Sequence, residues 1–310
     1  MSVNKNTQKS IRTIATSLTV GLAFIIQLSG CGGGGGSSDT PPPPPPPPPI
    51  SNCGISPANT TCKTIPVTNF GSRSFAFYEP STRQDLAPVV IFLHGAPGSP
   101  ASVENFFDGQ KFVDDNGYLA AIPLGQGLFG WSSSVTSSSS ISQDSQFVSD
   151  IIDDLVTNNQ ADPDKIFIAG FSAGGFMVYQ LACEIPEKIN SAFSVSGQYR
   201  GDLQACNAAF PLPIHHVHGT SDADVPDSGR SDNIATVQQT LDLWIGYNNC
   251  DGTSTDTASF VVTADNKSAI TTEYQNCDAS LKYTKVANGI HEQVYNMTEL
   301  HRLMNETFEP

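Results

Sequence analysis

One serine stands in a pattern that could make its side chain a nucleophile. The segment 170–174, Gly-Phe-Ser-Ala-Gly, follows an apolar run and precedes a stretch with helical spacing. In a sharp strand-to-helix turn, larger side chains at the two glycine positions would clash, whereas the serine hydroxyl would project from the sheet edge. The N-terminus of the following helix would favour a developing anion. The pattern predicts a nucleophile at Ser172.

A serine hydroxyl needs a base within hydrogen-bonding reach and an acid that orients the base. In hydrolases with this turn, the chain order is nucleophile, acid, base. His291 lies in a loop after the last strand-like run, where the base belongs, whereas His301 falls inside a terminal helical pattern. We predict His291 as the base, with His301 as the alternative.

Three aspartates follow the strand-like run 212–217. Asp222 ends the segment His-Gly-Thr-Ser-Asp, which places its carboxylate in the first loop after that strand. We predict Asp222 as the acid and Asp224 as its alternative; Asp227 is more distant in the chain.

Two backbone N–H groups should stabilise the oxyanion of a tetrahedral intermediate. One belongs to Ala173, directly after the nucleophile. The second should come from the loop after Leu93, where Ala96 is the candidate because Pro97 has no N–H. Trp131, which follows another strand end, is the candidate lining of an acyl pocket.

The run His215, His216 and His218 raises the question of a metal site. Neighbouring residues of a strand point to opposite faces, and no cluster of acids or cysteines joins these histidines in the sequence. We therefore predict neither a metal nor a cofactor, and a structural role for His218.

Apolar runs alternate with amphipathic ones, which is typical of an α/β fold with a mainly parallel sheet flanked by helices. Expected strands are 75–78, 88–93, 118–123, 165–169, 189–195, 212–217 and 281–286, and expected helices are 146–158, 174–183, 234–247 and 297–308.

The first fifty residues differ in composition from the rest. A basic start and an apolar stretch over residues 1–30 predict an export signal, and residues 28–31, Leu-Ser-Gly-Cys, resemble a bacterial lipobox with Cys31 as the lipidated residue. An ordinary signal peptide or an uncleaved anchor would also fit this stretch. Residues 31–50, rich in glycine and proline, would form a tether, or else a proline tract that recruits a partner. We expect the catalytic domain over 51–310.

Six further cysteines suit an oxidising compartment. Their order along the chain suggests disulfides between Cys53 and Cys62, Cys183 and Cys206, and Cys250 and Cys277, among the many pairings that six cysteines allow. The net charge of −15 becomes −18 when residues 1–30, with two Lys, one Arg and no acid, are removed. This charge argues against nucleic acid as a partner. We expect a protein lipid-anchored in the outer membrane or at the cell surface, or released from it.

From about Ser74 to its end the chain resembles the polyhydroxybutyrate depolymerase and feruloyl esterase family of α/β-hydrolases. The matching segments are Leu-His-Gly at 93–95, Asp-Ser-Gln-Phe at 144–147, Asp-Pro-Asp-Lys-Ile at 162–166, Gly-Phe-Ser-Ala-Gly-Gly-Phe-Met at 170–177, Leu-Ala-Cys-Glu at 181–184 and His-Gly-Thr-Ser-Asp at 218–222. The resemblance implies the α/β-hydrolase fold, the triad Ser172, Asp222 and His291, and a small acyl ester as substrate, often one end of a polymer.

The resulting hypothesis is an exported serine esterase that forms an acyl-enzyme. A polyhydroxybutyrate-like polyester is the first substrate class considered, and a feruloylated or acetylated plant or algal polysaccharide is nearly equal to it. A serine peptidase of the same fold and a non-catalytic binding protein are two further hypotheses that the sequence leaves open.

Overall fold

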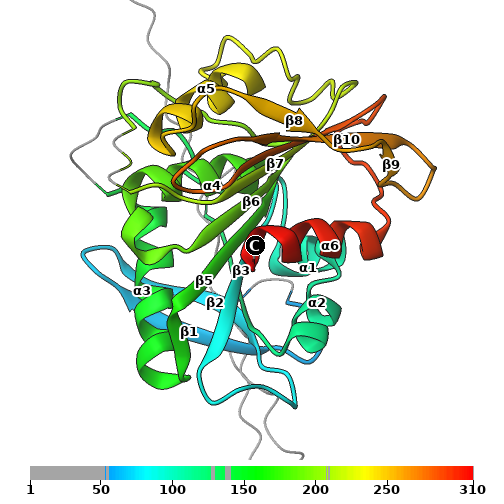
Figure 1. Cartoon of the computed structure of the whole chain (residues 1–310). Coiled ribbons are helices and arrows are strands. Elements are labelled where there is room, and N and C mark those ends of the chain that lie inside the picture. The colour runs from blue at the N-terminus through cyan, green and yellow to red at the C-terminus, as the bar shows by residue number, and fades with distance from the viewer. Residues whose placement is uncertain are drawn as a thin grey trace, which may run out of the picture. The chain divides into compact units, whose positions relative to one another are not determined.

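One sheet with a parallel centre organises the fold (Figure 1). The computed structural model describes residue 53 and residues 56–126, 130–136, 141–206, 208 and 210–309. In these residues the strand order is β1-β2-β4-β3-β5-β6-β7-β11-β10-β8, and β9 pairs with β10. The strands from β4 to β11 in that order pair in parallel, and the flanking pairs are antiparallel. The predicted class, a mainly parallel sheet flanked by helices, is confirmed.

The described strands have the following bounds. They are β1 (Thr61–Val67), β2 (Gly71–Tyr78), β3 (Ala87–Leu93), β4 (Leu119–Pro123), β5 (Ala161–Phe171), β6 (Ser191–Val195), β7 (Ile214–Gly219), β8 (Ser254–Asp256), β9 (Phe260–Val261), β10 (Ser268–Tyr274) and β11 (Leu281–Val286). Strands β3, β4, β6 and β7 are buried along their whole length, and β3 and β4 accordingly read as continuous apolar runs in the sequence.

Helices cover both faces of the sheet. They are α1 (Pro100–Phe107), α2 (Gly109–Asn116), α3 (Gln143–Asn158), α4 (Ala173–Glu184), α5 (Val237–Tyr247) and α6 (Met297–Phe308), with a short 3₁₀ turn at Pro186–Lys188. Side chains of α3, α4 and α5 join one core cluster, and those of α1, α2 and α6 join a second on the opposite face. Helix α4 is buried on all sides, so only tertiary packing can hold it.

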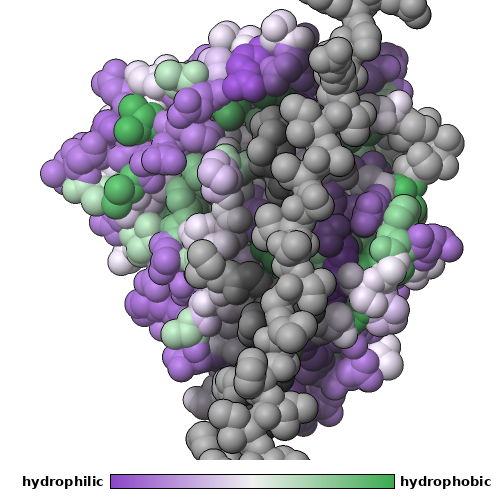
Figure 2. Space-filling model, turned by 180° about the vertical axis from the view of Figure 1, so that it is seen from behind, coloured by the Kyte–Doolittle hydropathy of each residue, from purple (hydrophilic) through white to green (hydrophobic). Residues whose placement is uncertain are grey.

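The sequence patterns did not predict β1, α1, α2 or β8 to β10. Strand β8 is exposed and β9 has two residues, so neither carries an apolar pattern. Helix α1 does carry a start signal, because Ser99 and Ser102 form a capping box and Pro100 stands at the first helical position. On the face opposite to that of Figure 1, the described surface is mostly hydrophilic, in line with 30 acidic against 15 basic residues (Figure 2).

Three disulfides link the cysteine pairs suggested by their order along the chain, namely Cys53–Cys62, Cys183–Cys206 and Cys250–Cys277. The predicted signal peptide, the lipidation site Cys31 and the tether lie outside the described residues. Within the described part, no helix is long and apolar enough to span a bilayer.

A buried ion pair joins the sheet to α3 and to the loops beside the site. The side chains of Arg73 on β2 and Asp144 on α3 are 2% and 7% exposed. Arg73 also donates to the carbonyl of Leu124, and Asp144 Oδ2 accepts hydrogen bonds from the N–H and hydroxyl of Ser132. The pair therefore anchors the chain at both Leu124 and Ser132.

We expect Arg73→Met to lower the free energy of unfolding by about 3–5 kcal/mol, because it leaves the Asp144 carboxylate buried without its cation. Denaturant titration measures this loss. Lys111→Met, which removes an exposed pair with Asp115, is the control and should leave the midpoint unchanged. Equal effects of the two variants would contradict a special role for the buried pair.

Candidate active site

Ser172 occupies a strained turn between β5 and α4. Its backbone has φ 56° and ψ −116°, a conformation that non-glycine residues rarely adopt. A Cβ on Gly170 would lie 2.3 Å from the carbonyl oxygen of Gly174, and a Cβ on Gly174 would lie 2.0 Å from that of Leu93. Both glycines of the motif are therefore required by close backbone contacts, and the turn holds Ser172 at the edge of the sheet.

The structure brings Ser172, His291 and Asp222 together in one hydrogen-bonded chain. His291 Nε2 lies 2.9 Å from Ser172 Oγ, and His291 Nδ1 lies 2.8 Å from Asp222 Oδ2. Asp222 lies in the loop after β7, and His291 lies in the loop after β11. These two strands are parallel neighbours, with Gly219 opposite Val286. Because the two strands end at the same sheet edge, their following loops meet there.

Asp224 and His301, the alternative acid and base, are not part of this hydrogen-bonded chain. Asp224 lines the cavity described below, but its described contact with Asp222 is through its backbone N–H. His301 is buried on α6, where its Nε2–H donates to the carbonyl of Phe107 at 2.7 Å.

Asp222 is held as a buried carboxylate. Its residue is 5% exposed, and its Oδ1 accepts backbone N–H groups of Asp224 at 3.0 Å and Val225 at 2.8 Å. Burial acts to raise the pKa of Asp222, but the hydrogen bonds from His291 and Val225 outweigh it and the pKa is lowered. The acid is therefore ionised where it orients His291.

Ala96 and Ala173 both line the cavity beside Ser172. Among the described residues, neither backbone N–H donates a hydrogen bond within the protein. The loop of Ala96 is held through His94, whose Nε2 accepts the Gly125 N–H at 3.0 Å and whose Nδ1–H donates to the Gly95 carbonyl at 2.7 Å. Burial lowers the pKa of His94, which favours the neutral ring that these bonds need.

Trp131 lies away from the cavity, contrary to the prediction that it lines the acyl pocket. It is 3% exposed and is not among the described residues that line the cavity. Its indole N–H donates to the carbonyl of His94 at 2.7 Å, and the two rings lie 4.9 Å apart. A buried indole needs an acceptor, and here that need fixes the loop that carries Ala96.

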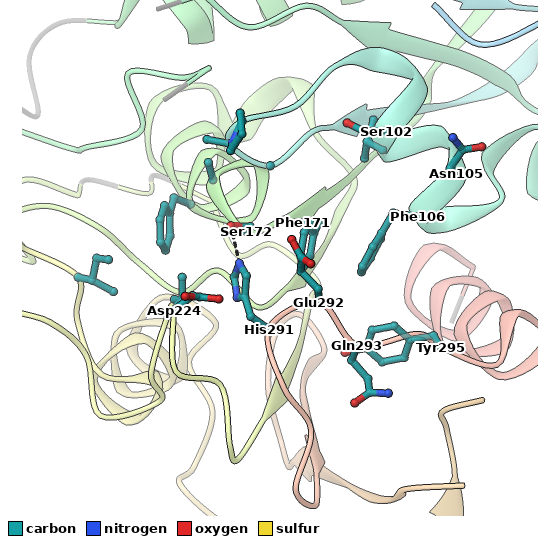
Figure 3. A pocket seen from close by; sticks show the side chains of 18 of the residues that line it. Ser102, Asn105, Phe106, Phe171, Ser172, Asp224, His291, Glu292, Gln293 and Tyr295 are labelled. Atoms are coloured by element: carbon teal, nitrogen blue, oxygen red, sulfur yellow. Dashed lines mark hydrogen bonds between the residues drawn. The ribbon is translucent and has the colours of Figure 1, made fainter. Parts of the chain in front are cut away.

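The cavity that contains Ser172 has a volume of about 780 Å³ and two chemically different ends. Phe106 stacks on Phe171 with ring centroids 4.1 Å apart, and Tyr295 meets Phe106 edge-on at 5.9 Å. Figure 3 shows these rings on one side of the Ser172–His291 pair and Asp224 on the other.

Four charged side chains line the cavity toward its second end, namely those of Arg200, Arg230, Asp224 and Asp232, whereas Glu292 lies on the side of the rings (Figure 3). Arg230 binds both carboxylate oxygens of Asp232, at 2.9 and 2.7 Å. Arg200 has no ion-pair partner among the described residues, and its guanidinium lies 5.9 Å from the Phe176 ring.

Sequence patterns missed most of these lining residues. Phe171 lies inside the nucleophile motif and could have been recognised. Phe106 belongs to the helix α1 that was not predicted, and Arg200 belongs to a loop without periodicity. No group of three or more His, Cys, Asp or Glu side chains in the described residues is placed to hold a metal ion.

Comparison with known proteins gives the family. Residues 80–244, more than half of the chain, match the model of the phospholipase/carboxylesterase family. The chain belongs to this family. The class of this family, carboxylic ester hydrolases with the α/β-hydrolase fold, is the one that the sequence predicted.

Two curated relatives carry more specific names. A bifunctional acetylxylan esterase/xylanase from Neocallimastix patriciarum is 30% identical over 48% of this chain and 21% of its own length. Feruloyl esterase B from Piromyces equi is 27% identical over 55% of this chain and 34% of its own length. The chain thus spans about a fifth to a third of these two proteins.

Solved structures share the fold at low sequence identity. Acetyl xylan esterase from Aspergillus awamori superposes with a TM-score of 0.58 and 15% identity, over 77% of this chain and 98% of that one. A feruloyl esterase module from Clostridium thermocellum, complexed with sinapinate, gives a TM-score of 0.51 and 11% identity over 85% and 92%. Both confirm the α/β-hydrolase fold.

We expect Gly174→Ala to abolish soluble folded enzyme or to reduce turnover of an ester strongly, because the added methyl group would overlap the Leu93 carbonyl. Gly246→Ala is the matched control, since a Cβ there meets nothing within 4 Å on α5. The control should stabilise the protein by about 0.5–1 kcal/mol. Thermal unfolding and an activity assay test both variants, and a wild-type-like Gly174→Ala would contradict the close contact.

Proposed function

We propose that this protein is a serine esterase that works through an acyl-enzyme. The observation that carries the proposal is the hydrogen-bonded chain Asp222–His291–Ser172, which opens into a cavity next to two unused backbone N–H groups. Family membership supports ester hydrolysis over peptide hydrolysis and over non-catalytic binding.

The geometry supports the following reaction. Ser172 Oγ attacks the ester carbonyl carbon while His291 Nε2 takes the hydroxyl proton, and the N–H groups of Ala96 and Ala173 stabilise the oxyanion. Collapse of the intermediate breaks the ester bond, and His291 returns the proton to the departing alcohol. Water then attacks the acyl-enzyme by the same route, which releases the acid and restores Ser172.

An aromatic acyl group fits the cavity best. The stacked rings of Phe106 and Phe171 lie beside the nucleophile, and the Phe171 ring is 5.1 Å from that of His291. Rings in this arrangement favour a planar aromatic guest through offset stacking. With relatives named as feruloyl and acetylxylan esterases, this favours a hydroxycinnamoyl ester over a polyhydroxybutyrate-like polyester.

The charged end of the cavity suits a hydroxyl-rich alcohol. Guanidinium and carboxylate groups form paired hydrogen bonds with neighbouring hydroxyls, and Arg200 and Asp224 both reach the cavity surface. A feruloylated polysaccharide would place its acyl group on the rings and its sugar at this end. The disulfides fit an exported protein, and lipid attachment at Cys31 stays part of the proposal.

Covalent labelling tests the nucleophile. A fluorophosphonate probe should label the wild type, and Ser172→Ala should remove the label and lower kcat roughly 10⁴- to 10⁶-fold. Intact mass should rise by one adduct, located at Ser172 by peptide mapping. Absence of labelling in folded wild type, or peptide cleavage without ester turnover, would reject the esterase proposal.

A comparison of two ester substrates tests whether the aromatic rings of the cavity bind the acyl group. Phe106→Ala should lower kcat/KM for methyl ferulate about 10-fold, since stacking and burial on this ring together contribute about 1–2 kcal/mol. Activity on p-nitrophenyl acetate should change much less, because its acetyl group has no ring to stack on Phe106. Phe210→Ala, at a ring that is 53% exposed outside the cavity, is the control. Faster release of hydroxybutyrate oligomers than of ferulate by the wild type would favour the polyester.

A further inference from the structure

The histidine run of β7 divides between the two faces of the sheet. His215 points to one face, where its ring nitrogens lie 3.0 Å from Thr307 Oγ1 and 2.7 Å from Thr284 Oγ1. His216 and His218 share the other face and stack with ring centroids 5.2 Å apart. All three side chains are fully buried. Nothing in the proposed reaction uses them directly.

The direction of the hydrogen bonds on that second face is fixed by the backbone carbonyl at one end. The Val225 carbonyl can only accept, so His218 Nε2, 2.8 Å away, must carry a proton. His218 Nδ1 then accepts from His216 Nε2–H at 3.1 Å. His216 Nδ1 is left as an acceptor for the Tyr179 hydroxyl at 2.9 Å. One tautomer of each ring satisfies every bond.

Both rings must stay neutral for this pattern to hold. Burial lowers the pKa of His216 and of His218, so the sites favour neutral imidazole. Every ring nitrogen of the two histidines already has a protein partner, which leaves none for a metal ion. The run that raised the question of a metal in the sequence thus contains two neutral rings, His216 and His218, that are linked to each other.

The chain of hydrogen bonds through His216 and His218 ends at Val225, which also binds the carboxylate of Asp222. Val225 accepts from His218 through its carbonyl and donates its N–H to Asp222 Oδ1 at 2.8 Å. His218 Nε2 also lies 3.5 Å from Asp222 Oδ2, the oxygen that accepts from His291. A shift of His218 would therefore move both the loop 222–225 and the carboxylate that it carries.

We propose that Tyr179, His216 and His218 are positioning residues for Asp222, and through it for His291. This rests on the proposed esterase function. The Val225 carbonyl selects the tautomer of His218, and His218 selects that of His216, whose Nδ1 accepts from the Tyr179 hydroxyl. The three side chains together hold Val225 so that Asp222 Oδ2 stays aligned with His291 Nδ1. None of the three is among the described residues that line the cavity, so they act on turnover and leave substrate binding unchanged.

The test compares substitutions on the two faces of β7. His218→Leu removes the donor to Val225, and we expect kcat to fall about 10- to 100-fold with KM within twofold of wild type, as for a displaced catalytic group. His218→Gln should restore most of the loss, because the amide nitrogen of glutamine reaches the position of Nε2 and can donate to the same carbonyl. His215→Leu is the matched control, because His215 is equally buried on the same strand and its described hydrogen bonds go to Thr284 and Thr307, not to the loop 222–225.

The proposal predicts that His215→Leu costs thermal stability but leaves kcat within twofold of wild type. Tyr179→Phe removes one hydroxyl and keeps the ring, and it should lower kcat several-fold. This variant still tests the proposal if His218→Leu does not fold. Equal loss of kcat in His215→Leu and His218→Leu, or wild-type kcat in both His218→Leu and Tyr179→Phe, would overturn the positioning role. If wild type neither turns over p-nitrophenyl acetate nor reacts with the fluorophosphonate, the esterase proposal fails instead.

Discussion

The site depends on the close contact between the backbone of α4 and the end of β3. Gly174 lies so near the Leu93 carbonyl that no side chain fits between them, and Gly170 lies equally close to Gly174. This contact forces Ser172 into its unusual backbone conformation and raises its hydroxyl above the sheet edge. Strain of this kind persists only when packing on both sides outweighs it, and here α4 is buried all round while β3 pairs with β5 from Val89 to Leu93.

The remaining parts of the site are brought to that hydroxyl by parallel strand pairing. Because β7 and β11 are neighbours, the loops of Asp222 and His291 emerge at one edge, although 69 residues separate them. Each loop is then fixed by buried polar groups. Trp131 and His94 hold the side of Ala96, and the ring chain from Tyr179 to His218 holds the side of Asp222. Such networks are stable only when every donor and acceptor is satisfied, which makes them specific to one arrangement.

The residues that line the cavity come partly from strand and helix ends and partly from more variable segments. Ser172 and Ala173 lie at the junction of β5 and α4, and Phe171 ends β5, whereas Phe106 comes from α1 and Arg200 from a loop. Loops tolerate changes in sequence better than the elements they connect. The reaction class therefore follows from the sheet, and the selection of an acyl group and an alcohol follows from segments that the sheet does not determine.

Local sequence patterns were enough to predict the class of fold, the long buried strands and the glycine-flanked turn at Ser172, because these depend on short segments with few possible conformations. The same patterns pointed to Asp222 and His291, which the structure places in one hydrogen-bonded chain with Ser172. They did not determine the place of Trp131, the aromatic rings at Phe106 and Tyr295, or the use of His216 and His218. Each of these depends on partners far away in the chain: Trp131 on the carbonyl of His94, Phe106 on Phe171, and His216 on the hydroxyl of Tyr179. Whether a buried indole or imidazole lines a pocket or supports one depends on which hydrogen-bond partner lies within reach, and that partner is brought close only by the tertiary structure.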